Sequence, residues 1–281
     1  MWVPSVSFVN SGEVMYVSSA PAGLNAIFGC VRPVIFENKD YGFESVTGTG
    51  FLLSFLGDVF FVTALHVLKA FDFDNQPPCV VYSLGGNHLL PMSEMRTFRA
   101  VDERDTDHVD VAVYRVDANT LDRTEFQAHH PYELGPDNLI RHYTPSMTLH
   151  FQGCPSENVH FDYDEKKHSL WFASGDLIYQ EPASCLHVHI GRAHVSASCP
   201  DFDGLSGSPV FQIDDKYSQT TPALFAGMLI RATRSSNIMR FLSAECISNY
   251  IYGFFVEGLT QEAADKRVLA LFEQHYGTIN L

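Results

Sequence analysis

The residues from Asp203 to Phe211, Asp-Gly-Leu-Ser-Gly-Ser-Pro-Val-Phe, include the types that acyl transfer by a serine hydroxyl requires. Such chemistry needs a serine on a tight turn and free backbone N–H groups that stabilise a negative oxygen. We expect Ser206 to be the nucleophile. Gly204 can adopt a conformation in which its N–H points the same way as the N–H of Ser206, so we expect these two groups to form an oxyanion hole. Ser208 replaces the second glycine of a Gly-x-Ser-x-Gly elbow and no helical pattern follows, which argues against an α/β-hydrolase. Taken alone, the run equally fits a plain Gly/Ser turn between strands.

Two further runs could supply a general base and a carboxylate that orients it. The apolar run Val59–Thr63 is followed by Ala64-Leu65-His66, which places an imidazole just beyond a predicted strand. A general base has to be held in one orientation, and Asp110, which leads into an alternating run at 111–116, is the predicted orienting carboxylate. Asp107 is the alternative, whereas the other acidic residues nearby fit better as solvated loop charges.

Short apolar or alternating runs, separated by Gly, Asp, Asn and Pro, dominate the chain and predict strands. The runs are 26–31, 50–55, 59–63, 80–82 and 111–116 in the first half, and 147–151, 169–172, 185–190, 209–213 and 224–230 in the second. From Ser243 the apolar residues fall on one helical face, and Thr260 can cap a helix. Two groups of strands followed by helix predict an all-β protein of two β-barrels with a C-terminal helix.

The expected organisation has four parts, with the crossing between the barrels in the stretch from Asp117 to Pro136. These parts are an N-terminal extension (1–24), an N-terminal β-barrel (25–125), a C-terminal β-barrel (126–245) and a C-terminal helical segment (246–281).

Together, the three chemical signals resemble the chymotrypsin-like (trypsin-fold) serine peptidases. The order His66, Asp110, Ser206 is the order of that clan, and the separations of 44 residues (110 − 66) and 96 residues (206 − 110) match its usual layout. Gly48-Thr49-Gly50-Phe51 looks like the strand that precedes the histidine in HtrA-type and glutamyl-endopeptidase-type members. Ser206–Phe211 is similar to the nucleophile strand of the latter. The resemblance covers roughly residues 25 to 250.

This resemblance implies two packed six-stranded β-barrels with a catalytic triad in the cleft between them. Ser206 would be the nucleophile, His66 the general base and then acid, and Asp110 the orienting carboxylate. The chain departs from the secreted trypsin relatives at Leu205, where they carry an aspartate that pairs with a newly cut N-terminus, and it has no cysteine directly after His66. Any activation is therefore expected to come from ordering of a loop or from a partner protein.

The resemblance also indicates where a substrate side chain would bind. The pocket would be floored near Asp201 and walled by Leu229, Ile230 and Arg231. Asp201 would favour a basic residue and Arg231 an acidic one, and the sequence does not decide between a basic and a small apolar preference. The glutamyl-specific relatives have a histidine on this wall, where this chain has Leu229 and Ile230, so specificity for glutamate is not indicated.

The net charge of −15, from 18 Lys+Arg and 33 Asp+Glu, disfavours nucleic acid and anionic membranes as partners. It also predicts that basic or neutral target segments approach more readily than acidic ones.

The chain starts without a secretory signal pattern and has no long apolar stretch, which predicts a cytoplasmic protein. Six cysteines without a Cys-x-x-Cys pair predict buried free thiols. Two imidazoles in His187-Val188-His189 lack a third ligand, so we expect no metal and no cofactor.

The leading hypothesis from the sequence is a serine endopeptidase that acts on a protein substrate through an acyl-enzyme, including the form of a latent effector protease released by a partner. The alternative is a binding or scaffold module that keeps the peptidase fold with little intrinsic activity.

Overall fold

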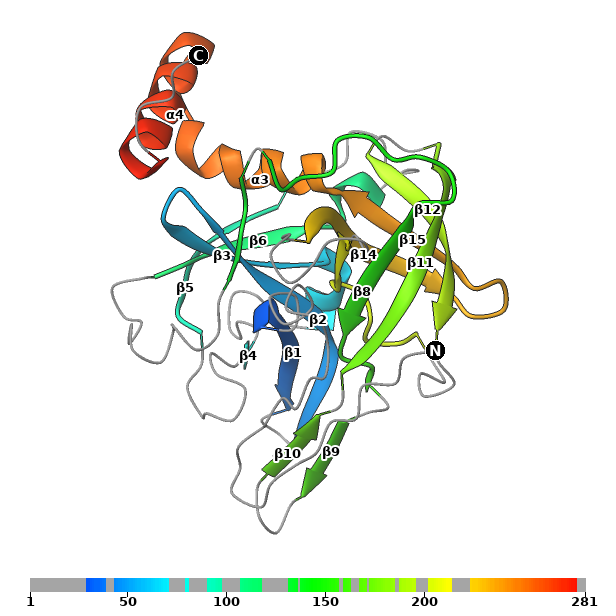
Figure 1. Ribbon diagram of the computed structural model, residues 1–281. Helices are drawn as coiled ribbons and strands as arrows, with labels where there is room; N and C mark the ends of the chain where they lie inside the picture. Colours follow the sequence, from blue (N-terminus) through cyan, green and yellow to red (C-terminus); the bar gives the residue numbers. More distant parts are fainter. Residues whose placement is uncertain are drawn as a thin grey trace.

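The computed structural model describes 13 separate stretches of the chain. They are residues 29–38, 43–70, 79–80, 90–97, 107–117, 131–135, 137–156, 159–162, 167–170, 172–184, 187–195, 202–213 and 223–276. Figure 1 shows two β lobes and, at the C-terminal end of the chain, two helices, of which the first lies along the lobes and the second extends beyond them.

The N-terminal lobe is a seven-stranded sheet in the order β4-β1-β2-β3-β6-β5, with β7 paired parallel to β2. Its strands are β1 (Val31–Asn38), β2 (Phe43–Phe55), β3 (Asp58–Thr63), β4 (Cys79–Val80), β5 (Met92–Arg96), β6 (Ala112–Val116) and β7 (Tyr132–Glu133). A tight turn at Leu56-Gly57, both with positive φ, joins β2 to β3. Phenylalanines of β2 and β3, among them the fully buried Phe51, Phe60 and Phe61, fill the core of this lobe.

The C-terminal lobe is a closed barrel of six strands in the order β11-β12-β15-β14-β13-β8. Its strands are β8 (Thr148–Gly153), β11 (Ala173–Pro182), β12 (Val188–Val195), β13 (Pro209–Gln212), β14 (Leu224–Thr233) and β15 (Ile238–Ser243). A separate two-stranded sheet contains β9 (Val159–Asp162) and β10 (Lys167–Leu170).

The prediction of two closed barrels therefore holds for one lobe only. In the described part of the chain the end strands of the first sheet, β4 and β5, do not pair with each other, so that sheet is open. The segments that adjoin β4 and β5 in the sequence, 71–78, 81–89 and 98–106, lie outside the described residues.

Two helices follow the barrel, where the predicted fold had one C-terminal helix. Helix α3 (Ala244–Val256) is capped by Ser243, whose hydroxyl accepts a hydrogen bond from the Cys246 N–H at 3.2 Å. Helix α4 (Gln261–Tyr276) is capped by Thr260, as predicted. Helix α3 packs on β14, while its Phe254 and Phe255 rings contact Phe60 of the N-terminal sheet. One helix thus joins both lobes.

Three cysteines, Cys30, Cys154 and Cys246, are buried free thiols, as the sequence predicts. Burial raises the pKa of the Cys30 thiol to about 12. Cys185 and Cys199 lie outside the described residues, and so does the side chain of Cys79. No helix in the described stretches is both long and apolar enough to cross a membrane.

Candidate active site

Strand pairing brings His66 and Asp110 together. His66 lies in the 3-10 helix η1 (Leu65–Ala70) directly after β3, and Asp110 lies between the 3-10 helix η2 (Asp107–Val109) and β6. Because β3 pairs with β6, with Thr63 opposite Ala112, the residues just outside this pairing meet. The His66 backbone N–H donates to Oδ1 of Asp110 at 2.8 Å, and Nδ1 of the ring lies 2.6 Å from Oδ2. Both oxygens of a nearly buried carboxylate therefore orient this histidine, and Nε2 remains for another partner.

The alternative carboxylate, Asp107, has a different environment. Its side chain is 8% exposed and contacts two arginines of the barrel, Arg231 of β14 at 3.1 Å and Arg240 of β15 at 2.7 Å. Among the described contacts, none joins Asp107 to His66. The structure therefore favours Asp110 over Asp107 as the partner of His66.

Ser206 lies on the loop 202–208 between the two lobes. Its hydroxyl donates to the carbonyl of Ile230 at 3.3 Å, and among the described contacts it makes no hydrogen bond to His66. Ser208, two residues later, is fully buried against Gly153, where an added Cβ would lie 2.0 Å from the Ser208 oxygen. Of these two serines, only Ser206 is accessible to solvent.

Most peptide groups of this loop are held by hydrogen bonds. Four carbonyls accept hydrogen bonds: Asp203 O from Ser156 N, Gly204 O from Thr49 Oγ1, Leu205 O from Ser208 N, and Ser206 O from Thr49 N. Three amides donate: Leu205 N to Phe202 O, Gly207 N to Leu229 O, and Ser208 N to Leu205 O. The amides of Gly204 and Ser206 have no acceptor among the described residues. In a trans peptide the N–H points opposite to the C=O, so the anchored Asp203 and Leu205 carbonyls fix these two free N–H directions.

Thr49 of β2 is the principal anchor of this loop. This fully buried residue donates from its hydroxyl to Gly204 O at 2.6 Å and from its backbone N–H to Ser206 O at 2.9 Å. Its hydroxyl also accepts from Cys154 N at 2.8 Å, and its carbonyl accepts from the Thr63 hydroxyl. The sequence drew attention to Thr49 only through a likeness to other strands. Its hydroxyl contacts were missed, because the motif does not reveal which loop the strand touches.

The predicted pocket residues do not gather around one cavity. Asp201 lies outside the described residues. The side chains of Leu229 and Ile230 are buried, and they belong to two different core clusters. The Ile230 carbonyl faces the Ser206 hydroxyl, whereas the Arg231 guanidinium lies against Asp107. Among the described wall residues, a floor for a substrate side chain is therefore not apparent.

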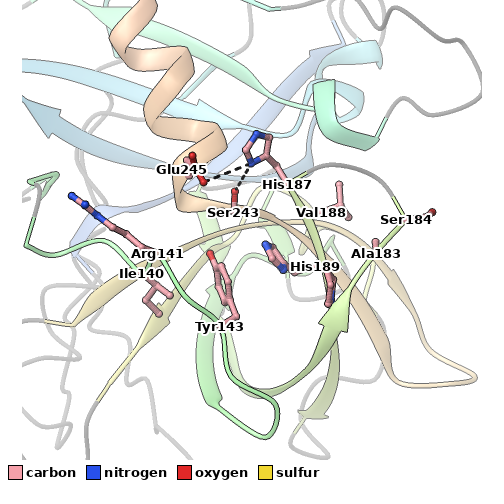
Figure 2. A pocket seen from close by; sticks show the side chains of 11 residues that line it. Ile140, Arg141, Tyr143, Ala183, Ser184, His187, Val188, His189, Ser243 and Glu245 are labelled. Atoms are coloured by element: carbon pink, nitrogen blue, oxygen red, sulfur yellow. Dashed lines mark hydrogen bonds and ion pairs between the residues drawn. The ribbon is translucent and has the colours of Figure 1, made fainter.

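A cavity of about 470 Å³ lies instead at the end of the barrel next to the start of α3 (Figure 2). Its lining includes Arg141, Tyr143, His187, His189 and Glu245, but none of the three residues predicted to form the triad. His187 Nδ1 lies 3.5 Å from the Ser243 hydroxyl and 4.0 Å from Glu245. Within the described stretches, His, Cys, Asp and Glu side chains form no group of three or more that could hold a metal ion.

His189 is a half-buried residue that packs against aromatic rings. Its ring stacks on Phe241 at 5.3 Å between centroids and also contacts Tyr143. Burial, with a smaller contribution from the charge of His187, lowers the pKa of His189 to about 4. The unfolded chain, with an ordinary pKa of about 6.5 at this residue, therefore binds more protons than the folded chain between these two values.

We expect His189 to make the protein less stable as the pH falls from about 6.5 toward 4. The variant His189→Phe keeps a ring on Phe241 but cannot titrate, so it should lose less stability in this range. Urea unfolding of both proteins near pH 7 and near pH 4.5 measures the difference. An equal loss in wild type and variant would contradict the assignment.

The fold and this geometry can now be compared with known proteins. No protein-family model matches the chain, and no curated protein matches it. Solved structures that resemble it are serine peptidases of the trypsin-like fold. One is the scabies mite inactivated protease paralogue S-I1, 13% identical, with a TM-score of 0.50 and coverage of 84% of this chain and 97% of the other.

Two further structures are similar at a lower level. They are the thermostable serine protease AL20 from an extremophilic microorganism (13% identity, 81% and 98% coverage, TM-score 0.49) and the inactive form of the Rv3671c protease (14%, 82% and 91%, 0.45). At these identities the likeness concerns the fold alone. The chain has a trypsin-like fold, and the narrower likeness to HtrA-type and glutamyl-endopeptidase-type members stays a prediction.

Proposed function

We propose that the chain is a serine endopeptidase in which Ser206 is the nucleophile, His66 the general base and Asp110 the carboxylate that orients it. The observation that carries this proposal is the hydrogen-bond pattern of the 202–208 loop. From Gly204 to Ser208 the amides without an acceptor among the described residues belong to Gly204 and Ser206, the pair predicted for the oxyanion hole. The carbonyls that precede these two amides are both anchored by hydrogen bonds, which supports fixed directions for the two N–H groups.

In this mechanism the Ser206 hydroxyl exchanges the Ile230 carbonyl for Nε2 of His66 by rotation of its side chain. The Ser206 oxygen then attacks the scissile carbonyl carbon while Nε2 takes the hydroxyl proton. The negative oxygen of the tetrahedral intermediate accepts hydrogen bonds from Gly204 N and Ser206 N, and Asp110 stabilises the charged imidazole. The C–N bond breaks as His66 returns the proton to the leaving amine, and water releases the acyl group from Ser206 by the same steps.

A second candidate function is a peptidase-fold binding or scaffold module. The observation in its favour is that the Ser206 hydroxyl is bonded to Ile230 O and, in the described contacts, not to His66. One structure of similar fold is also an inactivated protease paralogue. A latent enzyme lies between the two candidates, because a partner protein would then have to shift the Ser206 hydroxyl from Ile230 O to His66.

A serine-directed fluorophosphonate probe tests the proposal. We expect wild type to be labelled at Ser206, and labelling to disappear in Ser206→Ala but to persist in Ser208→Ala, because the Ser208 hydroxyl is buried. Peptide mapping by mass spectrometry locates the label. Labelling that appears only after a cell extract is added would indicate a latent enzyme. A folded wild type that is never labelled, alone or with extract, would favour the scaffold.

A further inference from the structure

Strand β14 has an unpaired edge beside Ser206. Strand β13 pairs with β14 only from Leu224 to Met228, whereas β15 pairs with it up to Thr233. In the described part of the chain, no strand therefore pairs with residues 230–233 on the side away from β15. The Ile230 carbonyl at the start of this edge accepts the Ser206 hydroxyl. An extended peptide added to such an edge would pass directly by the proposed nucleophile.

The outer face of the barrel at this edge carries three arginines. Arg231 and Arg240 are directly opposite each other on β14 and β15, with side chains 59% and 47% exposed. Arg240 is also opposite Ile190 of β12, and Arg192, two residues further along β12, is exposed on the same face. We call Arg192, Arg231 and Arg240 the arginine row. Like charges directly opposite on neighbouring strands normally repel, so this arrangement needs a partner anion.

Asp107 supplies only part of that partner. Each oxygen of the Asp107 carboxylate contacts one arginine. Two positive charges and one negative charge leave a net charge of +1 (2 − 1), and Arg192 adds one more positive charge. Each guanidinium has five N–H donors, and half-exposed side chains leave most of them facing solvent. Glu181, exposed on β11 opposite Ile190, is two strands from Arg240. Among the described residues the arginine row thus carries more positive than negative charge, in a chain whose net charge is −15.

We infer that the arginine row selects protein substrates that carry aspartate or glutamate close to the scissile bond; this inference rests on the proposed peptidase function. A side chain of an added strand that faces the same way as Arg231 would lie about 5 Å from it between Cβ atoms, within reach of a carboxylate–guanidinium pair. This inference differs from the expectation based on net charge, because the described charged side chains of the arginine row are mostly positive.

Binding to the catalytically inactive Ser206→Ala protein separates this inference from the proposed activity. Fluorescein-labelled decapeptides, one with four glutamates and one with four glutamines at the same positions, are compared by fluorescence anisotropy at low and moderate salt. We expect the glutamate peptide to bind more tightly, and the preference to weaken with salt. Adding Arg231→Gln, which can still donate to Asp107, should weaken glutamate binding roughly two- to fivefold.

Matched variants and a second readout complete the experiment. Arg192→Gln, in which no Asp107 contact is changed, should also reduce the preference, whereas Arg115→Gln removes the same charge from β6 and should not. Cleavage of a proteome-derived peptide mixture by wild type should show acidic residues enriched within about four positions of the cut. Equal binding of both peptides, or tighter binding of an oligothymidylate than of the glutamate peptide, would overturn the inference. Acid-selective binding without any cleavage, alone or with cell extract, would retain the row and reject the peptidase.

Discussion

Asp110→Asn is expected to slow phosphonylation of Ser206 by the fluorophosphonate probe roughly 10⁴-fold while leaving the protein folded. Asp110 accepts from both the backbone N–H and the ring of His66, and it is almost buried. An asparagine of the same shape can accept with only one atom and presents an NH₂ group with the other. If the NH₂ group faces the ring, His66 takes the wrong tautomer and no longer accepts the Ser206 proton.

The measurement is the second-order labelling rate of protein shown to be folded by circular dichroism. Asp58→Asn is the control, because it makes the same substitution in an ion pair with Arg115 at 2.5 Å, outside the site. We expect this control to be labelled at the wild-type rate. A labelling rate for Asp110→Asn within tenfold of wild type would exclude Asp110 as the orienting carboxylate.

Gly207→Ala is expected to abolish measurable labelling and to destabilise the protein by about 2–4 kcal/mol. Gly207 has φ +90°, and an added Cβ would lie 1.8 Å from the Thr49 carbonyl oxygen and 2.8 Å from the Thr63 hydroxyl. Both neighbours belong to buried strands of the other lobe. The loop, and not these strands, therefore has to move. Its movement would take Gly204 N and Ser206 N away from the position of the oxyanion, at a cost of at least about 10²-fold in rate.

Gly258→Ala separates the effect of the contact from the effect of the backbone angle. Gly258 also has positive φ, at +75°, but nothing lies within 4 Å of the place its Cβ would occupy. It should cost only about 1–2 kcal/mol, the strain of a left-handed alanine, and should leave labelling unchanged. Urea unfolding and labelling rates for both variants make the comparison. Similar behaviour of the two variants would show that the Thr49 contact does not matter.

The sequence placed each residue of the candidate site in or next to a turn that adjoins a predicted strand, and the catalytic roles of these residues stay predictions. His66 follows an apolar strand, Asp110 precedes an alternating one, and the structure pairs these strands. Gly204 and Gly207, on either side of Ser206, have φ of +88° and +90°. A tight turn with such angles favours glycine, so the glycines in the sequence indicate the turn. Ser243 and Thr260 could be read as helix caps for the same local reason.

The features that the sequence did not reveal depend on contacts between distant parts of the chain. Threonine is an ordinary residue in a strand. Thr49 matters because its hydroxyl binds Gly204 O, in a loop 155 positions further along the chain. Arg231 looked like a pocket wall because Asp107 was not known to lie against it. Net charge does not show how charges are arranged, so it could not reveal that Arg231 and Arg240 lie opposite each other on neighbouring strands. Closure of a sheet into a barrel also requires pairing of its end strands, which alternation of residues does not predict.

The contacts of Thr49 also bear on when this site forms during synthesis. The hydrogen bond from Thr49 to Gly204 spans 155 positions of the chain, and contacts of such long range form late in folding. The ribosome releases the part with His66 and Asp110 long before the part with Ser206. The Gly204 and Ser206 amides are therefore expected to become aligned only after the second lobe docks on β2. On this basis the loop 202–208 takes its described conformation only once both lobes have been synthesised and have docked.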